Sequence, residues 1–496
     1  MTPPVGRESR RTLGALLRSV VKVLCVSDAP DYEQPWQRQG AQSQVGSGAV
    51  IETERGLRVL TNAHCVSNHA FVELRRYGRA EKCEAEVEAI GHACDLALLR
   101  VADERFFDGT TALSVGELPE LGDRVHVCGY PLGGDRVSIT EGIVSRIELV
   151  SYAQSNRELL AVQIDAAIND GNSGGPVISQ DGRLAGVAFQ ALDDAESVGY
   201  MIAPEVVSHF LADVARERGE GFPAIGVLTQ PLENRAHRAY LGLPSDVDGG
   251  VLVTRVVFGG AAWGLIEPGD VLLEVDGVAV AADGAVVLRE GELISFHYIV
   301  SRLHVGDHMP VKLWRRGRAV YVSLTLTPPR YLVAEDRYDV RPSYFIFGGL
   351  LFVPLSRDYL KTWGNEWWQH APSDLVALYE SGVPTADQSE VVVLQKVLAD
   401  RVNQGYHDLE NLIVERVDGQ RIHSLADLVH RVREGDMHQY LRVEFSDGVE
   451  IVLDRREVRQ RHASVLSRFG VPQPHSQELG LRSAKPETTP PRITAA

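Results

Sequence analysis

Short apolar stretches separated by turn residues dominate the first part of the chain. Segments such as 48–51, 95–99 and 184–188 are rich in Val, Ile, Leu and Ala, and Gly, Asp, Asn and Pro lie between them. This spacing predicts many short strands of a β-barrel or sandwich. We expect a helix over 204–218 to close the domain, because Pro204 suits the first turn of a helix.

Two later segments share one pattern, in which a strand, an Asp-Gly turn and a second strand precede a helix. The Asp-Gly pair between apolar runs favours a tight hairpin turn. The recurrence predicts a diverged internal repeat of one small module. The first copy has its hairpin at 269–280, a helix at 293–303 and strands at 310–314 and 319–326, and the second has its hairpin at 411–422, a helix at 424–432 and strands at 441–445 and 449–453.

Composition narrows the function. The 496 residues predict about three domains. The net charge of −17 argues against a nucleic-acid-binding protein, because such proteins usually carry a basic surface. None of the five cysteines forms a C-x-x-C pair, so we expect no zinc ribbon, no metal and no cofactor. The cysteines are expected to be buried thiols; they are Cys25, Cys65, Cys83, Cys94 and Cys128.

The sequence also bears on the compartment. No apolar signal region follows the basic residues at the start, and the longest apolar run, 344–355, is too short to span a bilayer. Free cysteines are typical of reducing compartments. We therefore expect a cytoplasmic protein without a membrane span.

Three residues in the β-rich domain have the types and order of a catalytic triad: His64, Asp95 and Ser173. A serine hydroxyl needs a base to take its proton, and an imidazole can do so near neutral pH. A buried carboxylate fixes the imidazole tautomer and stabilises the imidazolium. The order His, Asp, Ser is that of the chymotrypsin-type triad.

The segment around the serine reads Gly-Asn-Ser-Gly-Gly, which lets the backbone turn tightly. We expect the backbone amides of Gly171, Asn172 and Ser173 to form an oxyanion hole. Asp103 and Asp108 are rivals for the acid, but Asp95 is preferred because it begins an apolar strand. Asn172 stands where digestive trypsin-like enzymes carry an Asp that pairs with a new amino terminus, so no activating cut is expected.

These motifs resemble those of the HtrA/Deg serine proteases. The resemblance lies in segments 61–66, 94–99, 129–133, 142–145 and 163–176, and the two later modules are similar to PDZ domains. Together with segment 31–37, the second half looks closest to the plant-type members. The resemblance implies a mainly β fold with a chymotrypsin-like double β-barrel over 12–218. It also implies two α+β PDZ-like domains at 222–328 and 338–465. The tail at 466–496 is rich in Pro, Ser and Thr and is expected to be disordered.

The resemblance further implies an ATP-independent endoprotease for unfolded or damaged proteins, built as a homo-oligomer of trimers. Its specificity loop maps to 190–200 and its regulatory loop to 149–159. Peptide capture by the first module is assigned to Ile225, Gly226 and Val227, and by the second to 347–350. Two alternatives stay open. One is that either module serves only packing or assembly. The other is that the chain is a PDZ-based binding protein or chaperone with a latent protease.

Overall fold

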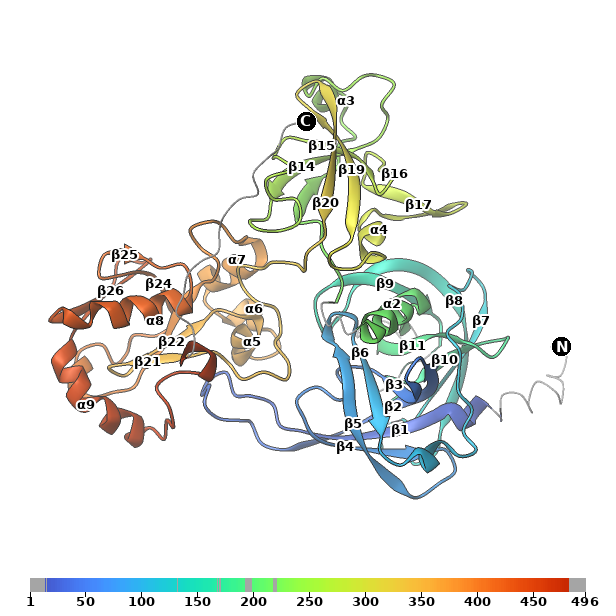
Figure 1. Cartoon of the computed structure of the whole chain (residues 1–496), viewed down its shortest axis with the longest axis horizontal. Coiled ribbons are helices and arrows are strands. Elements are labelled where there is room, and N and C mark those ends of the chain that lie inside the picture. The colour runs from blue at the N-terminus through green and yellow to red at the C-terminus, as the bar shows by residue number, and fades with distance from the viewer. Residues whose placement is uncertain are drawn as a thin grey trace. The chain divides into compact units, whose positions relative to one another are not determined.

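The computed structural model describes residues 14, 16–131, 133–166, 168, 171–191, 199–216 and 221–480. These residues form two compact units. The first unit comprises residues up to 28, 41–256 and 260–329, and the second comprises 29–40, 257–259 and the chain from 330 onward. Figure 1 shows their helices and strands.

Two closed six-stranded barrels form the body of the first unit (Figure 1). The predicted double β-barrel is therefore confirmed. One barrel has the strand order β1-β2-β3-β6-β5-β4, with β1 (Val20–Ser27), β2 (Gln42–Thr53), β3 (Gly56–Thr61), β4 (His69–Arg76), β5 (Lys82–Gly91) and β6 (Leu96–Val101). The other has the order β10-β11-β12-β9-β8-β7, with β7 (Arg124–Gly129), β8 (Ser138–Ser151), β9 (Glu158–Ile164), β10 (Pro176–Ser179), β11 (Leu184–Ala191) and β12 (Gly199–Ile202).

Helix α2 (Pro204–Ala215) follows the second barrel, with Pro204 in its first turn as expected. It buries Val206, Val207 and Phe210 in the same apolar core as the barrel strands. A short 3-10 turn, η1 (Leu17–Ser19), precedes β1, and two more lie between later strands; they are η2 (His92–Cys94) and η3 (Glu104–Phe107).

The first module belongs to the same unit. Asp276 and Gly277 have φ of 50° and 76°, as a two-residue hairpin turn requires, so the predicted turn is confirmed. The helix predicted over 293–303 is wrong at its start, because Leu293 is exposed and Ile294 buried in the alternation of a strand. The elements are β13 (Val227–Gln230), α3 (Arg235–Tyr240), β14 (Val251–Val256), β15 (Val271–Val275), β16 (Val278–Ala279), β17 (Ala285–Arg289), β18 (Glu292–Ser295), α4 (His297–Ser301), β19 (His308–Arg315) and β20 (Arg318–Thr325).

The second module repeats this plan in the second unit. Asp418 and Gly419 have φ of 50° and 78°, and Ser424 caps the helix that follows. Its strands are β21 (Phe345–Phe347), β22 (Leu350–Pro354), β23 (Val392–Val397), β24 (Leu412–Val417), β25 (Gln420–Arg421), β26 (Tyr440–Phe445) and β27 (Glu450–Asp454). Its helices are α5 (Arg357–Leu360), η4 (Lys361–Trp363), α6 (Trp367–His370), α7 (Ser373–Ser381), η5 (Arg401–Asn403), α8 (Leu425–Glu434), η6 (Gly435–Met437), α9 (Arg455–Arg468) and η7 (Gln477–Gly480).

The two modules differ at one edge of the sheet. The first has the order β13-β14-β15-β19-β20, so β13 is an edge strand. In the second, β22 takes the place of β13, but β21 pairs with its outer side through Phe345↔Phe352 and Phe347↔Leu350. Within the described part of the chain, the sheet edge that is open in the first module is therefore covered in the second.

Two of the predicted domain limits differ from the structure: the start of the C-terminal tail and the assignment of segment 29–40. The tail predicted from 466 begins too early, since Val471 is buried and His475 forms a β-bridge to Phe345. Residues 481–496 lie outside the described part. Segment 29–40, predicted within 12–218, belongs to the second unit, where Trp36 packs edge-on against Tyr344 at 5.9 Å between ring centroids.

Among the described residues, no helix is both long enough and apolar enough to cross a membrane.

Candidate active site

His64 and Asp95 meet because the strands beside them pair. His64 follows the end of β3 and Asp95 immediately precedes β6, and β3 pairs with β6 through Thr61↔Ala97. The His64 ring Nδ1 lies 2.7 Å from Asp95 Oδ2. Asp95 Oδ1 also accepts a hydrogen bond of 2.9 Å from the His64 backbone N–H. The carboxylate therefore holds both the ring and the backbone of the histidine.

The surroundings fix Asp95 in place. The residue is 2% exposed and has a left-handed φ of 52°, a conformation that Asp and Asn adopt more readily than most residues. Its backbone carbonyl accepts a hydrogen bond of 2.8 Å from Asn62 Nδ2. The rival Asp103 instead caps η3 by accepting from the Arg105 N–H. The structure thus brings Asp95, and not Asp103, to the histidine.

The environment favours a charged imidazolium at His64. Burial of the ring opposes the charge, but the adjacent Asp95 carboxylate outweighs burial and holds the pKa of His64 well above its usual value. A base placed against a buried carboxylate can accept a proton and keep the resulting charge stable. The pair is therefore equipped for general-base chemistry.

The serine loop is held against the first barrel. The Ser47 N–H donates to the Ser173 carbonyl at 2.8 Å. At Gly174, with φ of 82°, a Cβ atom would collide with the Ser47 carbonyl oxygen and the Thr61 hydroxyl. At Gly175 it would collide with backbone carbonyls. The two glycines therefore permit an approach of backbone to backbone that no other residue allows.

Hydrogen bonds also orient the peptide groups before the serine. The Gly171 carbonyl accepts from Ser47 Oγ at 2.7 Å, and the Asn172 carbonyl accepts from the Gly175 N–H at 2.9 Å. Because peptide groups are trans, the N–H groups of Asn172 and Ser173 point away from these bonds. Among the described residues, the N–H groups of Gly171 and Ser173 have no backbone acceptor. Such free donors suit an oxyanion.

The Ser173 side chain is oriented differently from the pair. Its hydroxyl has one hydrogen-bond acceptor among the described residues, the Phe189 carbonyl at 3.5 Å, and none on the His64 ring. Asn172 is 2% exposed, and its Oδ1 has no hydrogen-bond partner in the described part of the chain. Because a carboxamide carries no charge, this side chain cannot form the ion pair with an amine that an Asp would form.

Sequence analysis missed Ser47 and Asn62. Ser47 is fully buried in β2 and bonds both the Gly171 carbonyl and, at 2.8 Å, the Tyr130 N–H. The signal in the sequence is a polar residue between two glycines, directly before the apolar run 49–51. Of the predicted specificity loop, 192–198 lies outside the described residues. The predicted regulatory loop is the β8–β9 hairpin, anchored by Tyr152, whose hydroxyl donates to the Leu160 carbonyl at 2.6 Å.

The predicted peptide site of the first module lies at its open edge. Ile225 is buried, Gly226 has φ of 76°, and Val227 starts the edge strand β13. In the second module, the predicted loop 347–350 is instead the turn between the paired strands β21 and β22. Four cysteines are buried and Cys83 is partly exposed, and none forms a disulfide. Burial raises the pKa of the Cys128 thiol to about 12.

Comparisons with known proteins agree with this geometry. Residues 46–187 match a model of the trypsin-like peptidase domain, and residues 333–478 match a PDZ domain. The chain is 39% identical to "Protease Do-like 2, chloroplastic" of Arabidopsis thaliana over 94% of this chain and 76% of that protein. It is 36% identical to "Putative protease Do-like 3, mitochondrial" of the same plant, over 93% and 80%.

Among solved structures, an "HtrA-type protease AlgW with decapeptide" shares the fold, with a TM-score of 0.50 and 22% identity over 65% of this chain and 99% of that one. The chain is thus a serine-type endopeptidase with a trypsin-like barrel pair and a PDZ domain. From its identity to Do-like proteases over most of its length, it belongs to the HtrA/Deg family. The resemblance in its motifs is confirmed.

Proposed function

We propose that His64, Asp95 and Ser173 are the catalytic triad of an ATP-independent endoprotease that cuts unfolded or damaged proteins. The observation that carries this proposal is the 2.7 Å contact between His64 Nδ1 and Asp95 Oδ2, in a domain where the Ser173 loop is bonded to β2.

In this mechanism, His64 Nε2 takes the proton of the Ser173 hydroxyl as its oxygen attacks the peptide carbonyl. The N–H groups of Gly171, Asn172 and Ser173 line the oxyanion hole for the negative oxygen that forms. His64 then gives the proton to the leaving amine, and an acyl-enzyme on Ser173 remains for water to hydrolyse. Asp95 keeps Nδ1 protonated throughout, so that Nε2 faces the serine as an acceptor.

The direct test is Ser173→Ala with unfolded casein as substrate. Because alanine removes the nucleophile and little volume, we expect cleavage to be lost while the circular dichroism spectrum is unchanged. Ser67→Ala, which removes a buried hydroxyl of the same domain, is the control and is expected to retain cleavage. Undiminished cleavage by Ser173→Ala would exclude the assignment.

We further propose that the first module captures the C-terminal end of a peptide. Support comes from the edge strand β13, to which an extended peptide can add, and from the turn at Gly226 that precedes it. In the second module the same position is filled by β21. We therefore assign packing or assembly to the second module, and expect one peptide per chain.

Fluorescence anisotropy with a labelled C-terminal peptide tests this assignment. Gly226→Ala strains the turn at φ of 76° and is expected to weaken binding by about 10-fold, the loss of roughly one charged hydrogen bond. Gly242→Ala is the control, since it has a similar φ of 67° and no neighbouring atom within 4 Å. Equal effects of the two variants, or two peptides per chain, would contradict the proposal.

A latent protease is the second candidate function. It is favoured by the Ser173 hydroxyl, which bonds the Phe189 carbonyl and not the His64 ring. Under this proposal, binding at the first module reorders the serine loop. Casein cleavage measured with and without a C-terminal peptide distinguishes the two, because only a latent enzyme gains activity from the peptide.

Two further proposals concern the assembly of the chain and its compartment. We propose a homo-oligomer built from trimers, on the strength of the family resemblance, and light scattering coupled to gel filtration would test it. We also propose a reducing, cytoplasmic setting, supported by five cysteines of which none forms a disulfide. Localisation of the tagged full chain in cells would test the compartment.

A further inference from the structure

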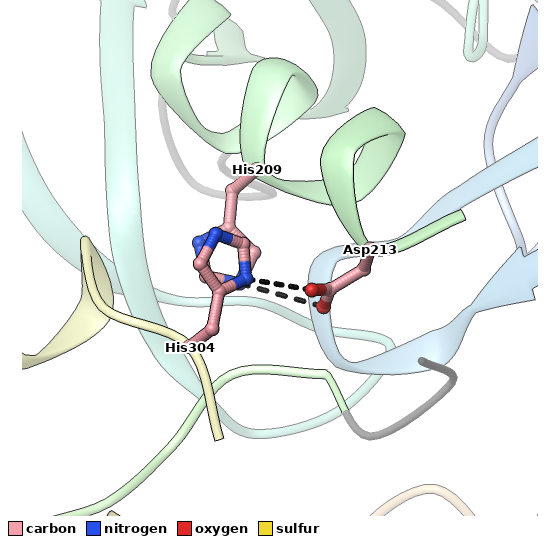
Figure 2. Close-up of side chains that lie close together, drawn as sticks. All are labelled: His209, Asp213 and His304. Carbon is pink, nitrogen blue, oxygen red and sulfur yellow. Dashed lines mark hydrogen bonds and ion pairs between the residues drawn. The ribbon is translucent and has the colours of Figure 1, made fainter. Parts of the chain in front are cut away.

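Two histidines and an aspartate gather where α2 meets the first module, away from the proposed triad. His209 and Asp213 lie one helical turn apart on α2, and His304 lies between α4 and β19. Their nitrogen and oxygen atoms lie within 4.8 Å of one another. Figure 2 shows the two rings stacked, with one nitrogen of each directed at the Asp213 carboxylate.

The distances are close to those of a metal site. His304 Nδ1 lies 2.6 Å from Asp213 Oδ1, and His209 Nε2 lies 3.5 Å from Asp213 Oδ2. Zinc bonds of ~2.0–2.1 Å place tetrahedral ligand atoms ~3.3 Å apart. The second distance already fits. The first, between His304 Nδ1 and Asp213 Oδ1, is a direct hydrogen bond. A bound ion would replace this bond and increase the distance between the two atoms by ~0.7 Å.

His209 has an unusual environment for a histidine. Its side chain is 5% exposed and stacks between Phe222 and His304, with ring centroids 4.1 and 4.0 Å away. Neither ring nitrogen forms a hydrogen bond of good geometry with a described residue, and its weaker polar neighbours are the Gly221 backbone and the Asp213 carboxylate, 3.5 Å from Nε2. A buried polar ring without hydrogen bonds is costly unless a ligand satisfies it.

The site is also accessible and supported. His209 and His304 line a cleft of about 490 Å³ that provides room for an ion and a solvent ligand. The Asp307 side chain accepts a hydrogen bond of 2.9 Å from the His304 N–H, which fixes the turn that carries the histidine. Two imidazoles and one carboxylate form a donor set that suits zinc.

We propose that His209, Asp213 and His304 bind Zn²⁺ and that the ion fastens the first module to α2 of the protease domain. Two ligands come from the helix and the third from the module, so the ion would bridge them. This differs from the sequence analysis, which expected no metal. The proposal is independent of the triad and of peptide capture.

The test uses the full chain without a histidine tag, stripped of metal and titrated with ZnCl₂ against a chromophoric chelator. We expect one Zn²⁺ per chain with a Kd of ~1 µM or tighter. His304→Gln and Asp213→Asn are expected to weaken binding by about 100-fold or more, beyond the loss typical of groups that merely support ligands. At a free Zn²⁺ concentration ~100 times the Kd, the thermal midpoint should rise by about 5 °C in the parent chain.

Two controls separate this site from others. His308→Gln removes an exposed histidine near the cluster and should leave binding unchanged. His64→Ala removes the histidine of the proposed triad, and tight binding should persist in it. The proposal is overturned if His304→Gln, verified as folded by circular dichroism, binds like the parent chain. It is also overturned if binding disappears in His64→Ala, or if no Zn²⁺ binds in the micromolar range.

Discussion

Replacing Asp95 by Asn tests the geometry of the proposed triad most sharply. Asp95 Oδ1 accepts from the His64 backbone N–H, while Oδ2 faces the ring nitrogen. In the variant, the single amide oxygen can keep only one of these roles. If it stays with the backbone N–H, the amide NH₂ faces Nδ1 and donates to it. The ring proton then moves to Nε2, which can no longer accept the serine proton.

The expected loss is about 10⁴-fold in kcat, the size associated with the wrong tautomer in a triad. This corresponds to about 5.4 kcal/mol of transition-state stabilisation. Folding should be preserved, because Asn tolerates the φ of 52° at this position and has nearly the same volume. Steady-state hydrolysis of a fluorogenic peptide gives kcat for the parent and the variant, and Asp103→Asn serves as the control carboxylate. A loss of less than about 10-fold in a folded variant would refute this account of Asp95.

The remaining predictions concern pH and stability. Only neutral His64 can act as the base, and Asp95 raises the pKa of this histidine. We therefore expect kcat/KM to increase with pH through a midpoint above about 6.5. A pH–rate profile should show this midpoint in the parent chain and a lower one in Asp95→Asn. Gly174→Ala should destabilise the protein by about 3 kcal/mol or more in urea unfolding, whereas Gly133→Ala, with a similar φ of 72° and open space, should cost about 1 kcal/mol. Arg455→Met should lower the free energy of unfolding by about 3–5 kcal/mol, because it removes a fully buried guanidinium that donates hydrogen bonds to a carboxylate and two carbonyls. An unchanged midpoint of urea unfolding would contradict this.

Local signals predicted much of the fold and of the candidate site. Short motifs of a few neighbouring residues indicate the candidate triad and the two Asp-Gly turns, at 276–277 and 418–419. The structure has the predicted barrels and turns. What could not be predicted depends on long-range packing. Nothing near 345–347 in sequence indicates that this strand covers β22.

The zinc proposal illustrates the same limit. His209 and Asp213 lie four residues apart on a helix that the sequence predicts, so two of the three residues in the cluster are expected on one helical face. His304 joins them only because the first module packs against α2, and tertiary contacts of this kind leave no local pattern. Ser47 was missed for a similar reason, since its partner Gly171 is distant in sequence.

The covering of β22 by β21 has a consequence for how copies of the chain meet one another. An exposed strand edge pairs with any extended backbone, including that of an identical molecule. The second module is protected from such pairing at β22, whereas β13 is short and open. A peptide and a neighbouring copy of the chain would therefore compete for β13. A bound peptide would then also prevent self-association of the protease through this strand.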